Sequence, residues 1–401
     1  MTKVVIIGAG LGGLAAACAL RQRGIAVEVY EQARSLGDVG AGIQMTPNAT
    51  RVIAALGLKS SFERIAFQAD AIVGRDGISG RELYRTPLRE AIRRTYGADY
   101  LHAHRHDLHA LLLNAAGGDV SVRLGSKCVD VRQDAKAVVA QFEDGREVEG
   151  DVVVGADGIH SAVRTALYGK ESASFTGNMC WRTLIPAARI PEGLVTPDIC
   201  MWQGPRGHVV TYYVRSGQLV NVVAVMESAD WVEESWNVRS RREELVEAYR
   251  GWSSRLTRLF RLADEVYRWG LFDREPMKRW TSGRVTLLGD AAHPMLPVLA
   301  QGAAMCLEDA IVLADVLKRC GATPAALAEY EALRRPRTTR VQLAARERGK
   351  IYHLDSPLKR FWRDAVYLLR GKVKPQSTGL ATDWIYEYDA SGLQLGQARY
   401  A

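Results

Sequence analysis

The feature that most constrains this chain is a glycine-rich turn near its N-terminus, between an uncharged strand and an alanine-rich helix. Val4–Ile7 is a β-branched run of the kind buried on both faces of a parallel sheet, and it leads directly into the turn Gly8-Ala9-Gly10-Leu11-Gly12-Gly13. After the helix, a second apolar strand, Ile25–Tyr30, ends at Glu31. This order is typical of a dinucleotide-binding βαβ unit. The sequence therefore predicts dinucleotide binding, without deciding between FAD and NAD.

Each glycine of this turn has its own predicted role. Gly8 allows the tight turn, Gly10 lets backbone N–H groups approach a pyrophosphate, and Gly13 lets the helix pack close to the strand. The pyrophosphate would lie at the helix N-terminus, where unpaired N–H groups favour negative charge. The carboxylate of Glu31 would accept hydrogen bonds from both ribose hydroxyls of an adenosine.

Composition argues against several other classes of protein. The 401 residues carry a formal net charge of +8, but Lys and Arg are scattered, so we expect small anionic ligands and no nucleic acid. The six cysteines show no paired spacing, which indicates neither a zinc site nor disulfides and favours a cytoplasmic location. No signal peptide and no apolar run of about 18 residues is recognisable, so no membrane association is predicted.

Two later segments repeat the pattern of a strand that ends in a polar turn. The apolar strand 152–154 leads to Gly155-Ala156-Asp157-Gly158 and a helix. The strand 285–288 ends in Gly289-Asp290, and a further helix opens near Gly302. Asp290 is placed to accept a hydrogen bond from a ribityl hydroxyl, and the helix N-terminus at Gly302 to stabilise negative charge on a flavin.

Other segments indicate a substrate-binding part. Alternating strands at 179–185, 199–203, 208–214 and 219–225 predict an inserted antiparallel sheet that forms the wall of a substrate pocket. The glycine-rich residues 37–42, followed by a helix over 49–56 that Asn48 would cap, are typical of a loop around a ligand. The histidines at 102, 104, 106 and 109 lack the spacing of a metal site, so no metal is predicted.

Together these motifs resemble the single-component FAD-dependent aromatic hydroxylases. The likeness rests on Gly8-x-Gly10-x-x-Gly13 with Glu31, on Asp157-Gly158, and on Gly289-Asp290 with the Pro-x-x-x-Gln-Gly segment 297–302, and it extends over residues 3–345. The chain is most similar to the group of salicylate hydroxylase, 3-hydroxybenzoate 6-hydroxylase and 6-hydroxynicotinate 3-monooxygenase. The segments 96–108 and 293–303 look especially like the last of these.

The resemblance implies an enzyme that uses FAD, NADH or NADPH as transient co-substrate, and O₂ to hydroxylate a small hydroxylated aromatic or heteroaromatic carboxylate. It also implies that the reaction proceeds through a flavin C4a-hydroperoxide. Decarboxylative hydroxylation of the 6-hydroxynicotinate or salicylate type, and simple hydroxylation of the 3-hydroxybenzoate type, are both open. A flavoprotein that relays electrons without hydroxylation is an alternative of another class. We expect a monomer or a homodimer.

The resemblance also suggests the residues of the site. His208 and Tyr212 match a His-x-x-x-Tyr strand and, four residues apart, project from the same sheet face, so we predict both as catalytic residues with His208 as the base. Gln44 stands where the 6-hydroxynicotinate enzyme has a histidine, which puts a pyridine substrate in doubt. The predicted substrate-binding residues are Gln44, His208, Tyr212, Pro297 and Gln301. The predicted cofactor-binding residues are Gly8, Gly10, Leu11, Gly13, Glu31, Gln32, Arg34, Gly42, Arg105, Val129, Asp157, Asp290, Pro297, Gly302 and Ala303.

The predicted fold class is mixed α/β, with a Rossmann-like FAD-binding domain, an inserted antiparallel-sheet substrate domain and a C-terminal helical tail. We expect a discontinuous FAD-binding domain of residues 1–72, 100–174 and 271–345. The substrate domain would comprise residues 73–99 and 175–270. Residues 346–401 would form the C-terminal helical segment.

Overall fold

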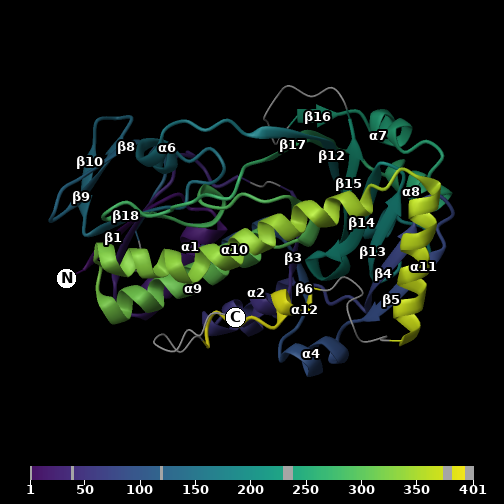
Figure 1. The fold of residues 1–401 in the computed structure, drawn as a ribbon, viewed down its shortest axis with the longest axis horizontal. Helices are drawn as coiled ribbons and strands as arrows, with labels where there is room; N and C mark the ends of the chain where they lie inside the picture. The colour runs from purple at the N-terminus through teal and green to yellow at the C-terminus, as the bar shows by residue number, and fades with distance from the viewer. Residues whose placement is uncertain (1, 38–39, 118–120, 229–237, 374–381, 393–401) are drawn as a thin grey trace.

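A five-stranded parallel sheet forms the centre of the nucleotide-binding part of the molecule (Figure 1). The structure is a computed structural model that describes residues 2–37, 40–117, 121–228, 238–373 and 382–392. In spatial order the strands of this sheet are β18 (Val285–Leu287), β11 (Val152–Gly155), β1 (Lys3–Ile7), β2 (Ala26–Tyr30) and β7 (Ser121–Arg123). All neighbours pair in parallel. The three predicted motifs follow the carboxyl ends of β1, β11 and β18, so they meet at one edge of the sheet.

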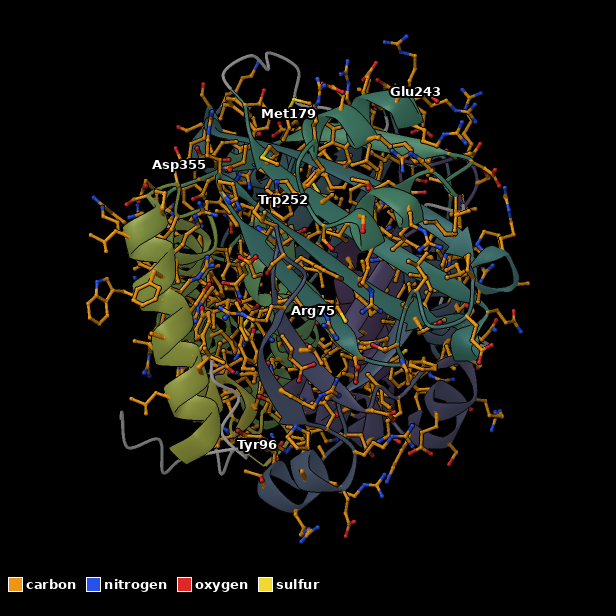
Figure 2. All side chains as sticks on the ribbon, turned by 90° about the vertical axis from the view of Figure 1, so that its right-hand side faces the viewer. Arg75, Tyr96, Met179, Glu243, Trp252 and Asp355 are labelled. Carbon is orange, nitrogen blue, oxygen red and sulfur yellow. The ribbon has the colours of Figure 1, made fainter. Side chains whose placement is uncertain are left out.

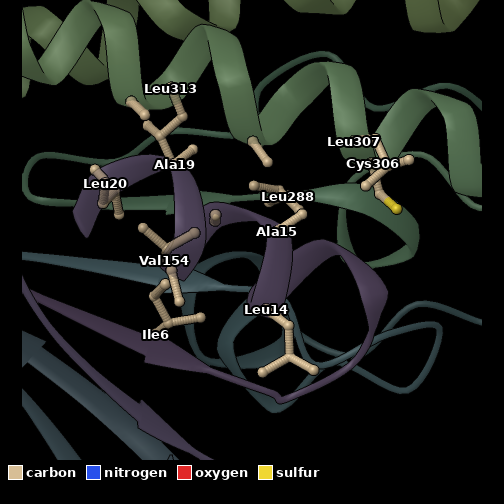
Figure 3. Close-up of a cluster of buried hydrophobic side chains, with 14 of the residues drawn as sticks. Ile6, Leu14, Ala15, Ala19, Leu20, Val154, Leu288, Cys306, Leu307 and Leu313 are labelled. Carbon is tan, nitrogen blue, oxygen red and sulfur yellow. The ribbon is translucent and has the colours of Figure 1, made fainter. Parts of the chain in front are cut away.

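Helices α1 (Leu11–Gln22) and α9 (Gly302–Cys320) lie over one face of this sheet. Figure 3 shows Val154 and Ile6 of the sheet below Leu20 of α1, with Leu14 of the same helix beside Ile6 and Leu313 of α9 above them. All five side chains are buried. Because α1 is rich in alanine, α9 can approach it closely, and this contact fixes the third motif beside the first.

A second sheet of eight strands forms the substrate-binding part. The predicted strands are confirmed as β12 (Ser174–Pro186), β13 (Ile199–Gly204), β14 (Gly207–Val214) and β15 (Leu219–Glu227). These four strands pair antiparallel with one another, as predicted, and β4 (Ala71–Asp76) joins the sheet by pairing in parallel with β13. Since β4 arrives from the N-terminal part of the chain by a long connection, no hairpin forces it to be antiparallel. The other strands of the sheet are β5 (Glu82–Pro87), β16 (Val238–Ser240) and β17 (Val266–Asp273).

Helix α2 begins two residues earlier than predicted. It spans Pro47–Ala55 with Thr46 as its N-cap, because Pro47 fits the first helical position and needs no N–H partner there. The prediction that Asn48 caps this helix is therefore wrong. Asn48 lies inside the helix, buried, and its side-chain amide donates to Glu308 Oε1 at 2.7 Å and to Gln301 Oε1 at 3.0 Å. A residue predicted as a cap instead joins α2 to α9.

Short elements complete the described parts of the chain. A two-stranded sheet of β3 (Gly42–Met45) and β6 (Leu101–His104) links the two larger sheets. A three-stranded antiparallel sheet consists of β8 (Cys128–Gln133), β9 (Val138–Phe142) and β10 (Glu147–Gly150). The shorter helices are α3 (Lys59–Ile65), α4 (Glu90–Tyr96), α5 (Arg105–Ala116), α6 (Ala162–Tyr168), α7 (Arg242–Ala248) and α8 (Ser254–Phe260).

The C-terminal region consists of α10 (Pro324–Tyr352), α11 (Pro357–Val373) and α12 (Asp383–Tyr386). Helix α10 runs without a break across the domain boundary expected after residue 345 and ends against the large sheet (Figure 1). Helix α11 packs beside β5 along one side of that sheet (Figure 2). Within the described residues, no helix is long and apolar enough to cross a membrane. Residues 38–39, 374–381 and 393–401, which belong to the predicted loop and tail, lie outside the described residues.

Candidate active site

The first glycine turn closes tightly against the second motif. Gly8 has a φ of +106°, and a Cβ on it would lie 2.4 Å from the carbonyl oxygen of Ala156. A Cβ on Gly13 would lie 2.0 Å from the carbonyl oxygen of Gly8. Only glycine is compatible with either position, because backbone atoms occupy the space that a side chain needs. These two glycines therefore have the structural roles that the sequence predicted.

Gly10 differs from its neighbours because nothing crowds it. A Cβ there would meet no heavy atom within 4 Å, and its φ of −71° is accessible to any residue. Packing within the protein therefore gives no reason for glycine at this position. The first N–H groups of α1 have no partner within the helix, and an open backbone in front of them suits a pyrophosphate.

Glu31 stands at the end of β2, beside this turn. Its carboxylate accepts hydrogen bonds from the backbone N–H of Ala9 and of Ala33, both at 2.8 Å. The predicted cofactor residues Gly8, Gly10, Glu31, Gln32 and Asp157 line one cavity of about 300 Å³. The structure thus brings together five residues from three separate segments in a space suitable for the adenosine end of a dinucleotide.

Asp157 organises the second motif from a half-buried position. One carboxylate oxygen accepts from Ser161 Oγ at 2.5 Å and the other from the N–H of Val163 at 3.1 Å. Burial raises the pKa of Asp157, and these hydrogen bonds offset part of that effect. The buried Arg164 donates to the carbonyl oxygen of Ala291 at 2.9 Å, which ties the second motif to the third.

A buried network of charges holds the third motif in place. Asp309 accepts from the N–H of Gly289 at 3.1 Å and from His293 Nε2 at 2.6 Å, and Arg334 Nε donates to its other oxygen at 2.7 Å. Glu308, next to Asp309 on α9, binds Arg334 and Arg337, each at 2.7 Å. Burial by itself would raise the pKa of Asp309, but His293 and Arg334 outweigh it and lower that pKa. The turn that carries Asp290 is thus fixed to α9 and α10.

Asp290 follows Gly289 directly and lies next to this network. Its side chain is exposed and makes no hydrogen bond to another described residue. With Pro297 it lines a second cavity, to which Ile159 and Trp269 also contribute. Its free carboxylate has the chemistry needed to bind a ribityl hydroxyl. Gly302 and Ala303 follow as the half-buried first residues of α9.

His208 and Tyr212 lie on the same face of β14, as predicted. Val210 and Val214 of that face belong to an apolar cluster with Tyr212, whereas Val209 faces a different cluster. The rings of His102 and Tyr212 are 4.7 Å apart, and Gln44 hydrogen-bonds to Tyr212. Gln44 Oε1 also accepts from the hydroxyl of Tyr100 at 2.5 Å.

Burial controls the protonation of this face. It lowers the pKa of His102 to about 3, and together with the neighbouring His353 it lowers that of His208 well below its usual value. Both imidazoles are therefore neutral at pH 7. Burial also raises the pKa of Tyr212, which stays a hydrogen-bond donor.

The third motif reaches this face from the opposite side. Val298 and Leu299, inside the Pro-x-x-x-Gln-Gly segment, pack against the apolar cluster that contains Tyr212. The N–H of Gly42 donates to Asn221 Oδ1 at 2.8 Å, and a Cβ on Gly42 would lie 2.8 Å from the ring of Tyr212. The predicted substrate residues and the predicted flavin end of the cofactor site are thus adjacent.

Three residues on this face escaped the sequence analysis. Gln203 pairs with His208 across β13 and β14 and is completely buried, with its Nε2 lacking a hydrogen-bond partner. Tyr352 and His353, at the end of α10, contact the His208 ring. The only signal for the last two was their position after a long helical pattern, and nothing in the sequence indicates where such a helix ends in space.

The remaining predicted residues have varied surroundings. Gln301 is buried, and its amide bonds to Thr46 and Asn48. Arg34 and Arg105 are exposed, and Arg105 donates its backbone N–H to the carbonyl oxygen of Ala41. Val129 is exposed on β8, and Leu11 is buried in the core. The roles predicted for these side chains stay predictions.

FAD fits the residues at this edge of the sheet. Glu31 suits its ribose, the open backbone at Gly10 suits its pyrophosphate, and Asp290 suits its ribityl chain. The segment 297–302 follows Asp290 in the chain and lies next to the face of His208 and Tyr212. The arrangement can therefore hold a flavin between a nucleotide site and a second, largely apolar site.

Comparisons with known proteins agree with this geometry. A family model described as FAD binding domain matches residues 1–345. The chain is 41% identical to a 3-amino-4-hydroxybenzoate 2-monooxygenase of Streptomyces platensis, over 97% of this chain and 96% of that protein. It is 36% identical to a 3-hydroxybenzoate 6-hydroxylase of Polaromonas naphthalenivorans, over 96% of both chains. The structure of Klebsiella pneumoniae HpxO with FAD and uric acid matches with a TM-score of 0.86 and 30% identity, over 96% of this chain and 97% of that chain.

Proposed function

The chain belongs to the FAD binding domain family and is an FAD-dependent aromatic monooxygenase, and from that premise we propose that it hydroxylates a small aromatic carboxylate with a hydroxyl group on its ring. The observation that carries this proposal is the buried face with His208, Tyr212 and Gln44, adjacent to segment 297–302. It combines aromatic walls with two neutral imidazoles, those of His102 and His208, and several hydrogen-bonding groups. Such a lining suits a flat aromatic ring with polar substituents.

The protein's own contribution would be to position the ring, exclude water and accept a proton. FAD held in this site and reduced by NADH or NADPH would activate O₂, from which the transferred oxygen atom comes. The ring reacts well only if a hydroxyl or amino substituent releases its proton as the new C–O bond forms. Since burial keeps His208 neutral, its ring can take that proton. Tyr212 and Gln44 would hydrogen-bond to the ring substituents.

The first substrate to test is 3-amino-4-hydroxybenzoate. Relatives at 41% identity over nearly the whole chain bear that name. In this acid, C2 carries a hydrogen atom and is ortho to the amino group, so hydroxylation there retains the carboxylate. We therefore propose hydroxylation without loss of carbon dioxide. Gln44, which cannot change its charge, would bind the amino or hydroxyl substituent.

The test is product formation by the purified holoenzyme with a panel of acids. The panel comprises 3-amino-4-hydroxybenzoate, 3-hydroxybenzoate, salicylate, 6-hydroxynicotinate and, for comparison, uric acid. Hydroxylated product, carbon dioxide and hydrogen peroxide are each measured with NADH and with NADPH. We expect coupled hydroxylation of an aminohydroxybenzoate or hydroxybenzoate without carbon dioxide. Peroxide as the only oxygen product with every acid would contradict the proposal. Release of carbon dioxide would show that the enzyme is of the decarboxylating type.

A further inference from the structure

Two histidines from distant parts of the chain meet beside the proposed substrate site. His208 Nδ1 lies 2.7 Å from His353 Nε2, and the ring centroids are 5.0 Å apart. His208 is on β14, whereas His353 directly follows α10, 145 residues later. We propose that His353 is the proton-relay partner of His208, so that the two imidazoles carry a proton from the substrate to solvent. This inference rests on the proposed function.

The contact requires that one of the two facing nitrogens is protonated and the other is not. At 2.7 Å one nitrogen must donate and the other accept, so the two facing nitrogens share one hydrogen. Burial lowers the pKa of His353 to about 4, and burial with the neighbouring His353 lowers that of His208 well below its usual value. Both rings are therefore neutral at rest. With the shared hydrogen on His208 Nδ1, its Nε2 has a free lone pair.

The surroundings favour transfer in one direction. His208 is only 3% exposed, whereas His353 is partly exposed, so the second ring is the one that can reach water. His208 Nε2 makes no hydrogen bond to another residue in the described part of the chain. None of the carboxylates described hydrogen-bonds to either ring, so no acid is present to hold a positive charge on His208. A proton gained by His208 must therefore leave quickly, and His353 is the group in contact.

The relay consists of three proton transfers. The O–H or N–H bond of the ring substituent breaks, its electron pair moves toward the ring as the new C–O bond forms, and the proton binds His208 Nε2. His208 Nδ1 gives its hydrogen to His353 Nε2, and His353 Nδ1 releases one to water. Each ring then carries its hydrogen on Nε2. Exchange of protons with water returns both hydrogens to Nδ1. One proton has moved from substrate to solvent, with no change in oxidation state.

The remaining groups around the pair are hydrogen-bonding rather than charged. The ring of Tyr352 lies 5.4 Å from that of His208, and the Tyr249 hydroxyl donates to the backbone oxygen of His208. Gln203 lies opposite His208 in the sheet, and its Oε1 accepts from the Tyr367 hydroxyl at 3.5 Å.

The test compares His353→Gln with wild type and with Lys350→Gln, an exposed change at the same end of α10. Glutamine keeps a hydrogen-bond acceptor for His208 but cannot relay a proton. We expect His353→Gln to lower the kcat of product formation by about 10- to 100-fold, with KM and the rate of flavin reduction within about twofold of wild type. Peroxide should rise at the expense of product. Imidazole should partly restore the activity of His353→Ala, since it can replace the missing ring.

A second measurement does not depend on turnover. In ¹⁵N-histidine-labelled holoenzyme, His208 and His353 should titrate as a coupled pair, and His353→Gln should shift the His208 ring resonances, while Lys350→Gln should not. The relay is refuted if His353→Gln keeps wild-type coupled turnover, or if the His208 resonances do not respond. Wild type that makes no product from any acid, with the coupled resonances present, would instead overturn the proposed function and leave the histidine pair established.

Discussion

The glycine turn offers a sharp test of the cofactor site, because alanine at two of its glycines should have different effects. At Gly10 it should weaken FAD binding, and at Gly13 it should lower the stability of the protein. In Gly10→Ala the new Cβ meets no heavy atom within 4 Å and the backbone stays in a region open to alanine. We expect the apoprotein to be as stable as wild type, or more stable by about 0.5 kcal/mol, because alanine restricts the unfolded chain. In Gly13→Ala the Cβ would lie 2.0 Å from the Gly8 carbonyl oxygen. Backbone must then move, at a cost of about 3 kcal/mol.

FAD binding should separate the two variants further. If the pyrophosphate approaches the backbone at Gly10, an added methyl group would push it away and weaken one charge-assisted hydrogen bond. Such a bond contributes about 1.5–3 kcal/mol, so the Kd for FAD should rise by about 10- to 150-fold. Gly10→Ala would then be a folded protein that binds FAD poorly.

Two titrations measure these effects on the apoprotein. Urea unfolding followed by tryptophan fluorescence gives stability, and quenching of flavin fluorescence gives the Kd for FAD. If Gly10→Ala binds FAD within a factor of two of wild type, the pyrophosphate does not lie against this backbone. If its apoprotein is destabilised as much as that of Gly13→Ala, the structural distinction between the two glycines is wrong.

Three further predictions concern the charge network, the proposed base and acid stability. Arg334→Met should lower the free energy of unfolding by about 3–5 kcal/mol, because Glu308 and Asp309 lose a buried partner, whereas the neighbouring Arg335→Met should cost under about 1 kcal/mol; equal midpoints in urea would contradict this. His208→Ala should lower product formation by about 10²- to 10⁴-fold while FAD stays bound and peroxide is released, and near wild-type coupled turnover would show that another group is the base. The pKa of His353 falls from 6.5 to about 4 on folding, so the unfolded chain binds more protons between these values; stability should therefore be full above pH 6.5 and decline as the pH falls toward 4. Each such histidine adds a slope of about 1.4 kcal/mol per pH unit, and urea midpoints at pH 7 and 5 should show a smaller loss for His353→Gln than for wild type.

Local patterns in the sequence were sufficient to predict the first βαβ unit, where we place the cofactor. Strand, glycine turn, helix and terminal acid are continuous from residue 4 to 31, and their geometry follows from φ, ψ and hydrogen bonding within that segment. The period-2 pattern of 208–214 likewise placed His208 and Tyr212 on one face. The same reasoning failed at Asn48, because a proline at the first helical position moved the cap to Thr46. The parallel pairing of β4 with β13 was not predicted, because nothing local determines the direction in which these strands pair.

By itself, therefore, the sequence determined the elements, the three cofactor motifs and the family to which the chain belongs. Only the tertiary structure decided that Asn48 joins α2 to α9, that Arg334 binds two adjacent carboxylates, and that His353 contacts His208 across 145 residues. The physical reason is the separation along the chain over which each kind of interaction acts. Backbone preferences and side-chain periodicity act over a few residues and leave a direct record in the chain, whereas these contacts depend on where long helices end once the cores of both sheets have packed.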